Sequence, residues 1–292
     1  MESDTELARG PCRLSGTLMQ PDPTGTARTV VLIVAGSGPT DRDGNAPAVG
    51  LRTDSLKQLA TALAEAGVAS LRYDKRGIGR SAAGASDERT LRFETYVEDA
   101  TAWLRMLAAD PRFDRIAVLG HSEGALIAAL CAAIMPVSAV ISVAGTARPA
   151  GVLLRSQLAG RLSGPLAIAH EAILVGLEAG RTTDAVPPEL LFLYRPSVQP
   201  YLVSWLRQRP LDAVAALQVP LLVVHGAADA QVDVEDGPLL VAARPGARLA
   251  VVDGMDHLLK RAGPDASSYA DPTRPLAPGL VDSILRFLDG PR

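Results

Sequence analysis

The sequence predicts an α/β protein whose strands form a mostly parallel, doubly wound sheet. Short apolar runs rich in β-branched residues alternate along the chain with segments whose apolar residues recur at helical spacing. Continuously apolar runs are typical of strands that are covered on both faces. The runs are residues 29–35, 68–73, 116–119, 139–143, 219–224 and 249–252. Strands and helices in turn favour parallel pairing through right-handed crossovers.

Length and composition allow a large soluble core and exclude several classes of protein. The chain has 292 residues, of which 48% are hydrophobic and 21% charged, so it is not a disordered chain. The net charge of −3 argues against a nucleic-acid partner. Two cysteines, Cys12 and Cys131, exclude a disulfide scaffold. No cluster of histidine, cysteine and carboxylate has the spacing of metal ligands, so we expect neither a metal nor another cofactor.

Taken in order, the first elements start at the edge of the sheet and lead to its centre. Residues 11–20 have strand character without a following helix, which predicts an antiparallel edge. Residues 56–63 and 93–109 are amphipathic, and Gly67 is a plausible stop for the first of these helices. Residues 125–145 carry no charge, and we interpret them as a buried helix followed by a buried strand rather than a membrane span.

The alternation is interrupted by a long insertion at residues 148–215. A structureless loop of this length is improbable in a compact protein, and the segment contains helical patterns separated by prolines. These patterns cover residues 153–162, 166–177 and 201–207. We therefore expect a helical cap at 148–215, inserted into a core domain made of residues 1–147 and 216–292.

Ser122 is the candidate nucleophile. It occupies the centre of G-x-S-x-G, between an apolar strand and a helical run, which is the context of a nucleophile elbow. The flanking Gly120 and Gly124 allow a tight turn in which a Cβ would clash. The turn places Ser122 at a helix N-terminus, where free N–H groups favour developing negative charge.

The candidate general base is His257. A serine hydroxyl needs a base within hydrogen-bond reach, and the sequence has only four histidines. His257 follows the strand at 249–252, at the sheet edge where catalytic groups of α/β proteins gather. His121 is expected to pack beside the turn, His225 to shape the turn after its strand, and His170 has no supporting signal.

Asp229 is the candidate acid that orients this base. It follows the strand at 219–224 and so lies at the same sheet edge as Ser122 and His257. Asp233, Asp253 and Asp256 remain alternatives, although the last two lie so near His257 in the chain that facing its ring requires an awkward turn.

Two backbone amides are expected to form an oxyanion hole. The elbow itself supplies the N–H of Glu123. The second donor should come from the glycine-rich segment 36–39 after the first central strand, and we expect the N–H of Ser37. A plain turn is the alternative interpretation of this segment.

With Ser122, Asp229 and His257 in this order, the sequence resembles those of the α/β-hydrolase superfamily. Within that superfamily it is most similar to the bacterial serine carboxylesterase branch, described as lysophospholipase-like or prolyl-aminopeptidase-like. Residues 11–290 are covered by the resemblance, and five motifs carry it, at residues 36–45, 74–81, 120–124, 225–229 and 254–257. It implies an eight-stranded, mostly parallel sheet and a cap that walls the acyl or alcohol pocket. In that branch the segment 41–45 is an active-site rim, and its charges Asp41, Arg42 and Asp43 are expected to be solvated or paired with one another.

The expected reaction is hydrolysis of carboxylic esters with small to medium apolar acyl groups, through an acyl-enzyme on Ser122. A thioesterase, lactonase, aminopeptidase or acyltransferase would use the same residues. A catalytically silent binding protein of this fold is a further alternative. The N-terminus lacks the layout of a secretory signal, which predicts a cytoplasmic protein, bacterial by resemblance.

Overall fold

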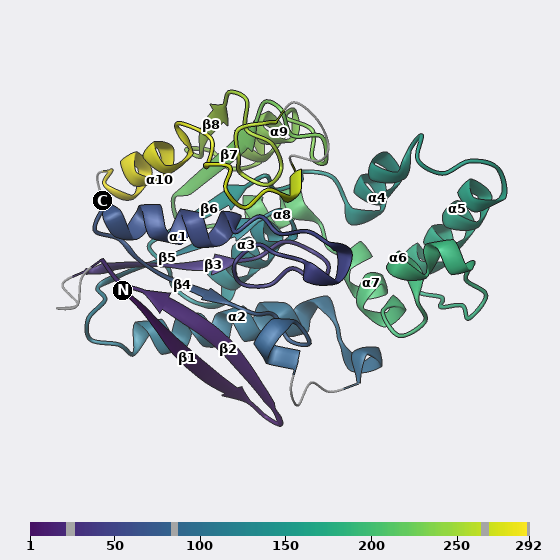
Figure 1. The fold of residues 1–292 in the computed structure, drawn as a ribbon, viewed down its shortest axis with the longest axis horizontal. Coiled ribbons are helices and arrows are strands. Elements are labelled where there is room, and N and C mark those ends of the chain that lie inside the picture. Colours follow the sequence, from purple (N-terminus) through teal and green to yellow (C-terminus); the bar gives the residue numbers. More distant parts are fainter. Residues whose placement is uncertain (22–26, 83–86, 264–268, 291–292) are drawn as a thin grey trace.

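The computed structural model describes residues 1–21, 27–82, 87–263 and 269–290. Its sheet has eight strands in the order β1-β2-β4-β3-β5-β6-β7-β8 (Figure 1). Pairing is parallel from β4 through β8 and antiparallel for β1 and β2. The strands are β1 (Glu2–Arg9), β2 (Cys12–Met19), β3 (Thr29–Val34), β4 (Ala69–Tyr73), β5 (Arg115–His121), β6 (Ala139–Val143), β7 (Leu221–Gly226) and β8 (Arg248–Val252). The predicted fold class is thus confirmed.

The antiparallel pairing expected for residues 11–20 is confirmed, but the expected place at the edge of the sheet is wrong. The segment at 11–20 is not the edge, because β2 pairs with β4 on one side and with β1 on the other. Strand β1 was missed because its residues are polar and largely exposed, so it lacks the apolar run that marks a central strand. Its pairing extends over its whole length, from Glu2 opposite Met19 to Arg9 opposite Cys12.

Helices cover both faces of the sheet and complete two hydrophobic cores. Along β3, Val31 and Ile33 face one core, whereas Val30, Leu32 and Val34 face the other, as the two-residue repeat of a strand requires. The first core is closed by α1 (Ser55–Glu65) and α10 (Leu280–Leu288). The second is closed by α2 (Phe93–Ala108), α3 (Glu123–Ile134) and α9 (Asp236–Ala243).

Between β6 and β7 the chain leaves the sheet and forms a series of helices, all of which except the last extend to the right in Figure 1. They are α4 (Ala150–Leu158), α5 (Gly164–Glu178), α6 (Leu191–Tyr194), α7 (Gln199–Leu206) and α8 (Pro210–Ala215). Helix α8 packs against α3 and α9. We call α4 to α7 the cap; the predicted division into a core domain and a cap at 148–215 stays a prediction.

Short 3-10 helices occupy several connections between these elements. They are η1 (Pro47–Val49), η2 (Gly79–Ala82), η3 (Glu88–Thr90) and η4 (Pro188–Leu190). The uncharged segment at 125–145 contains most of α3 and all of β6, as expected. Within the described part of the chain, no helix is both long and apolar enough to cross a bilayer.

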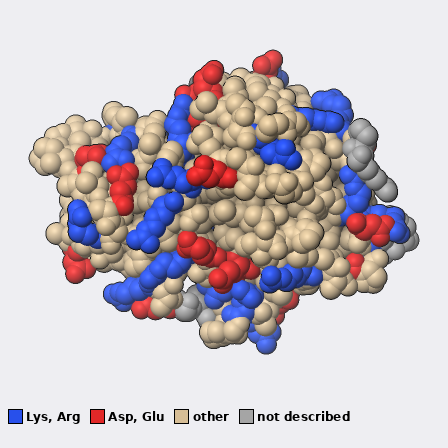
Figure 2. All heavy atoms as spheres, turned by 180° about the vertical axis from the view of Figure 1, so that it is seen from behind, with Lys and Arg blue, Asp and Glu red and all other residues tan. Residues whose placement is uncertain are grey.

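Acidic and basic side chains are interspersed over the face of the molecule that Figure 2 shows. This distribution suits a chain with 29 basic and 32 acidic residues.

Candidate active site

Ser122 lies at a sharp turn between β5 and α3. Its backbone has a φ of 55° and a ψ of −120°, a strained conformation for a residue with a side chain. A Cβ on Gly120 would lie 1.9 Å from the carbonyl oxygen of Gly124, and a Cβ on Gly124 would lie 2.3 Å from that of Val34. Only glycine fits at these two positions, which is the physical reason for the motif. The half-buried Ser122 lines a large cavity.

Asp229 and His257 are in direct contact. Asp229 Oδ2 lies 2.8 Å from His257 Nδ1, and both side chains are buried. Asp229 Oδ1 accepts hydrogen bonds from the amides of Gln231 and Val232, at 2.8 and 3.0 Å. Burial alone would raise the pKa of Asp229, but the contacts with His257 and the two amides outweigh it and lower that pKa. The contact through Nδ1 leaves Nε2 of His257 as the ring nitrogen for Ser122.

The structure also places His257 beside the turn that holds Ser122. The Nε2 atom of His121 lies 2.8 Å from the carbonyl oxygen of His257, and the two ring centroids are 4.9 Å apart. Among the described residues, no hydrogen bond joins Ser122 to His257, so their pairing stays a prediction. Catalytic hydrogen bonds are often long before substrate binds.

The alternative carboxylates are engaged elsewhere. Asp256 Oδ1 accepts from the amides of Leu258 and Lys260, and its Oδ2 pairs with Arg274 at 2.9 Å. Asp233 pairs with Arg148 at 3.4 Å. Asp253 is exposed. Asp229 is therefore the carboxylate that the geometry favours as the partner of His257.

The other histidines have structural surroundings. Burial lowers the pKa of His121 to about 3, so its ring is neutral and donates to the backbone of His257. The Nδ1 atom of His170 lies 2.8 Å from the hydroxyl of Tyr194, within the cap. His225 is fully buried at the end of β7, where burial lowers its pKa.

The segment after β3 lies against the Ser122 turn, and its role as an oxyanion loop stays a prediction. A Cβ on Gly36 would lie 3.3 Å from the Cβ of Ser122. The N–H of Ser37 donates to no other backbone group of the described chain, and Ser37 lines the cavity together with Ser122. Glu123 is the first residue of α3, where a backbone N–H has no acceptor within the helix.

Sequence reasoning missed a buried polar cluster beneath these two amides. The side chains of Lys75 and Glu123 are 1% and 2% exposed and form an ion pair of 3.0 Å. Lys75 Nζ also donates to the carbonyl oxygen of Gly36 at 2.5 Å. The hydroxyl of Tyr201, on cap helix α7, donates to Glu123 Oε2. The position of Lys75, two residues after a buried strand, was the available signal.

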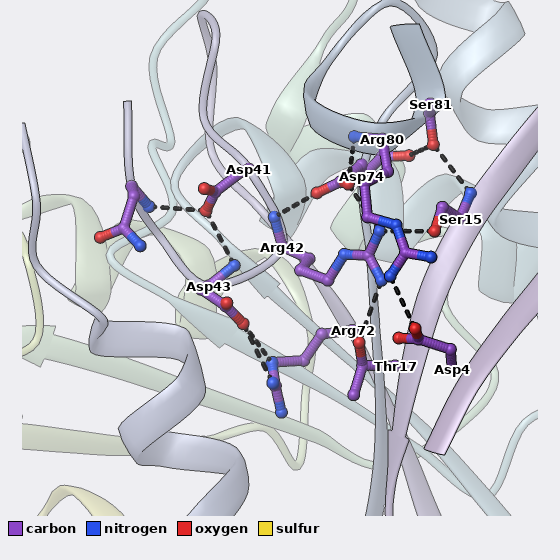
Figure 3. A network of polar contacts seen from close by, with 11 residues as sticks. Asp4, Ser15, Thr17, Asp41, Arg42, Asp43, Arg72, Asp74, Arg80 and Ser81 are labelled. Carbon is purple, nitrogen blue, oxygen red and sulfur yellow. Dashed lines mark hydrogen bonds and ion pairs between the residues drawn. The ribbon is translucent and has the colours of Figure 1, made fainter. Parts of the chain in front are cut away.

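The expectation that the charges of the segment 41–45 are solvated or paired with one another is wrong for Arg42 and Asp43. Arg42 is neither solvated nor paired with its neighbours, because its guanidinium is buried against Asp74 at 2.7 Å and also donates to Ser15 and Thr17 (Figure 3). The Arg42 amide donates to the other oxygen of Asp74. Asp43 pairs with Arg72 of β4. These contacts pin the segment to the sheet, and they could not be assigned from local sequence because their partners lie far away in the chain.

A cavity of about 760 Å³ lies between the cap and the core. Ser37, Lys75, Ser122 and Glu123 line it from the core side. Most of the remaining wall is apolar and includes cap residues Leu153, Leu154, Phe192, Leu193, Val198, Leu202 and Trp205. In the described ranges, no group of three or more histidine, cysteine or acidic residues could hold a metal ion.

Comparison with known sequences finds similarity to a family model and to a curated protein. The family model described as "Serine aminopeptidase, S33" matches residues 50–174. The chain is 30% identical over 250 residues to Esterase EstD of Thermotoga maritima. That alignment covers 84% of this chain but only 58% of EstD, so the chain spans little more than half of that protein.

Comparison with solved structures shows the same fold. Est1E of Butyrivibrio proteoclasticus, solved with ferulic acid, has a TM-score of 0.66 at 20% identity, covering 87% of this chain and 91% of that chain. GrgF of Penicillium sp. sh18, described as an alpha/beta hydrolase, has a TM-score of 0.64 at 21% identity, with 99% and 97% covered. At this level of identity the structural likeness shows the fold alone.

Proposed function

Because the chain belongs to the α/β-hydrolase superfamily, we propose that it hydrolyses carboxylic esters through an acyl-enzyme on Ser122. The observation that carries the proposal is the strained Ser122 turn, open to an apolar cavity and adjacent to the Asp229–His257 pair. The relative EstD is named an esterase, which supports the choice of ester bonds.

In the first half of the reaction, Ser122 Oγ attacks the ester carbonyl carbon while Nε2 of His257 takes its proton. Asp229 holds the proton on Nδ1 of His257 and stabilises the imidazolium that forms. The two amide donors to Asp229 Oδ1 fix the carboxylate, so that its other oxygen stays on the ring. His257 then protonates the leaving alcohol, and the C–O bond of the ester breaks.

The negative charge of the tetrahedral intermediate is held by the N–H groups of Ser37 and Glu123. Fixed donors aimed at the developing oxyanion supply a large part of catalysis, and removing one typically costs about 10²–10³-fold in rate. In the second half, water attacks the acyl-enzyme, again with His257 as base, and the carboxylic acid leaves Ser122.

The wall of the cavity favours an apolar acyl or alcohol group. Leu126 of the core and the cap residues Leu154 and Trp205 contribute apolar surface to the cavity that Ser122 lines. Burial of such surface contributes roughly 25 cal/mol per Å². Acyl chains of small to medium length are the proposed substrates, and the cap is proposed to act as the wall that selects them.

Peptide N-termini are less suited to this cavity than esters. An aminopeptidase needs a free carboxylate for the substrate ammonium, whereas both carboxylates in the cavity wall are paired. Glu88 binds Arg195, and Glu123 binds Lys75. Thioesters, lactones and acyl transfer would use the same groups as ester hydrolysis, and substrate panels of p-nitrophenyl esters, acyl-CoAs, lactones and aminoacyl amides separate them.

The Ser122→Ala variant tests the proposal. It should abolish turnover of p-nitrophenyl esters while the melting temperature stays close to that of the wild type, since the side chain lines an open cavity. Ser156→Ala, at an exposed position of cap helix α4, is the matched control and should retain full turnover.

A serine-directed phosphonate provides an independent readout by mass spectrometry. The wild type and Ser156→Ala should form one adduct at Ser122, and Ser122→Ala should form none. Undiminished turnover in Ser122→Ala would rule out the nucleophile. An unlabelled wild-type chain would favour a non-catalytic binding protein instead.

A further inference from the structure

We propose that Lys75 is a positioning residue of the oxyanion hole, which aims and polarises the Ser37 N–H through the carbonyl oxygen of Gly36. The proposal rests on the function proposed above and assigns a residue that positions one of the backbone donors of the same site. Among the described residues, Lys75 forms no hydrogen bond with Ser122, Asp229 or His257, so its action would be exerted through the backbone.

The contact between Lys75 and the loop is short and buried. Lys75 follows β4, and its side chain is 1% exposed. Its Nζ lies 2.5 Å from the carbonyl oxygen of Gly36 and 4.9 Å from the centre of the Tyr96 ring. A hydrogen bond from an ammonium is roughly twice as strong as one between neutral groups.

The geometry of the peptide bond turns this contact into an effect on Ser37. Gly36 C=O and Ser37 N–H belong to one peptide group, which is trans because the described chain has no cis peptide bond. In a trans peptide the C=O and N–H point in opposite directions. Fixing the oxygen on Lys75 therefore fixes the N–H on the other side. Withdrawal of electron density toward the ammonium also makes that N–H a stronger donor.

Glu123 completes a link between the two proposed donors. Its backbone N–H is the second donor of the hole, and its side-chain Oε1 lies 3.0 Å from Lys75 Nζ. Its Oε2 accepts from Tyr201 on the cap. The peptide group of Ser37 and the first residue of α3 are thus held by a single chain of contacts through one ammonium.

Stability alone gives a weak reason for these charges. Two ionic groups that are almost fully buried cost several kcal/mol in desolvation, and apolar side chains of similar volume often stabilise a fold as well or better. An ammonium that fixes the carbonyl oxygen of an oxyanion-hole peptide, in contrast, holds the N–H of that peptide in place for the developing oxyanion. Lys75 lines the cavity that holds Ser122, which is the place where that charge would develop.

The test compares a p-nitrophenyl ester with its thiono analogue, in which sulfur replaces the carbonyl oxygen. Sulfur is a poorer hydrogen-bond acceptor, so an intact oxyanion hole favours the oxygen ester. In Lys75→Met, kcat for the oxygen ester should fall about 10- to 100-fold with KM within about threefold. The ratio of kcat/KM for the oxygen ester to that for the thiono ester should fall with it.

Two variants separate positioning from charge balance and stability. Lys75→Met with Glu123→Gln removes both charges, and its melting temperature should recover relative to Lys75→Met while the oxygen-to-sulfur ratio stays low. Arg72→Met removes another cation, 1% exposed, from β4 and should lower stability without changing that ratio.

A direct view of the peptide group is possible because Gly36-Ser37 is the only Gly-Ser pair in the sequence. Cell-free synthesis with carbonyl-¹³C glycine and ¹⁵N serine gives a single amide-to-carbonyl correlation in NMR. Loss of the ammonium in Lys75→Met should shift the Gly36 carbonyl and the Ser37 amide, whereas Arg72→Met should leave both in place.

The outcomes distinguish the two proposals. A lowered ratio in both Lys75 variants, with shifted Gly36 and Ser37 resonances, supports the positioning role. A wild-type ratio in folded Lys75→Met, or a ratio restored in the double variant, overturns it while leaving the esterase intact. Absence of ester turnover in the wild type itself overturns the proposed function, and the catalytic role of Lys75 with it.

Discussion

The two halves of the candidate site are built in different ways. The acid–base half consists of Asp229 and His257, on the segments that follow β7 and β8. Its carboxylate is held by amides two and three residues further along the same loop. The oxyanion half lies on the segments after β3, β4 and β5, and it is held by Lys75, Glu123 and Tyr201, which are far apart in the chain.

This difference predicts which substitutions should affect each half of the site. The Asp229 carboxylate depends mainly on its own loop, to which the cap adds one hydrogen bond of 3.3 Å, from Gln157 of α4 to the carbonyl oxygen of Gln231. The oxyanion half, by contrast, includes a hydrogen bond from α7, so a change in the cap can reach the backbone donors. His121 joins the halves, because it precedes Ser122 and donates to the carbonyl of His257.

The largest expected effect is in the acid–base half. Asp229→Asn should lower kcat on the order of 10⁴-fold, because the amide favours the wrong tautomer of His257 and cannot stabilise the imidazolium. Steady-state kinetics with a p-nitrophenyl ester measures it. Asp233→Asn, a nearby carboxylate that pairs with Arg148, is the control. A loss of less than about tenfold in Asp229→Asn would direct attention to Asp233, Asp253 or Asp256.

A smaller effect is expected where the cap meets the oxyanion half. Tyr201→Phe removes a hydrogen bond to the Glu123 carboxylate, a type of bond that contributes about 1.5–3 kcal/mol to stability. We expect kcat to fall about three- to tenfold, with a smaller change in the oxygen-to-sulfur ratio than in Lys75→Met.

Tyr194→Phe is the matched control, since Tyr194 is a buried cap tyrosine that bonds His170 instead. Equal kcat losses in Tyr201→Phe and Tyr194→Phe would mean that both act through general loosening of the cap. The comparison between the halves would then lose its basis.

The smallest effect concerns the pH dependence of stability at the joint between the halves. Burial lowers the pKa of His121 from 6.5 to about 3, so between these values the unfolded chain binds a proton that the folded chain does not. Stability therefore falls as the pH falls, by up to roughly 1.4 kcal/mol per pH unit for this group.

His121→Gln keeps an N–H donor for the carbonyl of His257 but cannot be protonated. Urea unfolding measured between about pH 4 and pH 8 gives the free energy of unfolding at each pH. Plotted against pH, this free energy should rise less steeply in His121→Gln than in the wild type, by an amount that corresponds to at most one bound proton. Identical slopes in the two proteins would contradict a neutral, buried His121 as a source of acid sensitivity.

Most of the sheet and the acid–base half could be predicted from the sequence. The central strands have apolar runs, and strand ends of a parallel sheet meet at one edge, so Asp229 and His257 could be placed together before any coordinates. The elbow glycines have a local steric reason that the distances confirm, since a Cβ at Gly120 or Gly124 would overlap backbone atoms.

The missed parts share a physical cause. Strand β1 is polar on both faces and becomes part of the sheet through its pairing with β2. This pairing cannot be predicted from the local sequence of β1. Likewise Arg42 and Lys75 have buried charges whose partners, Asp74 and Glu123, are 32 and 48 residues away. Burial of a charge is decided by tertiary pairing, and a single sequence read locally predicts the commoner, solvated state.

The buried guanidinium of Arg42 has a consequence for how the chain can be trimmed. It donates to Ser15 and Thr17 of β2 as well as to Asp74, so the antiparallel hairpin of β1 and β2 supplies part of its hydrogen-bond acceptors. A fragment that began at the first parallel strand would leave these donors without acceptors in the protein interior, at a cost of about 1–3 kcal/mol each. Minimal versions or circular permutants of this protein should therefore retain the N-terminal hairpin.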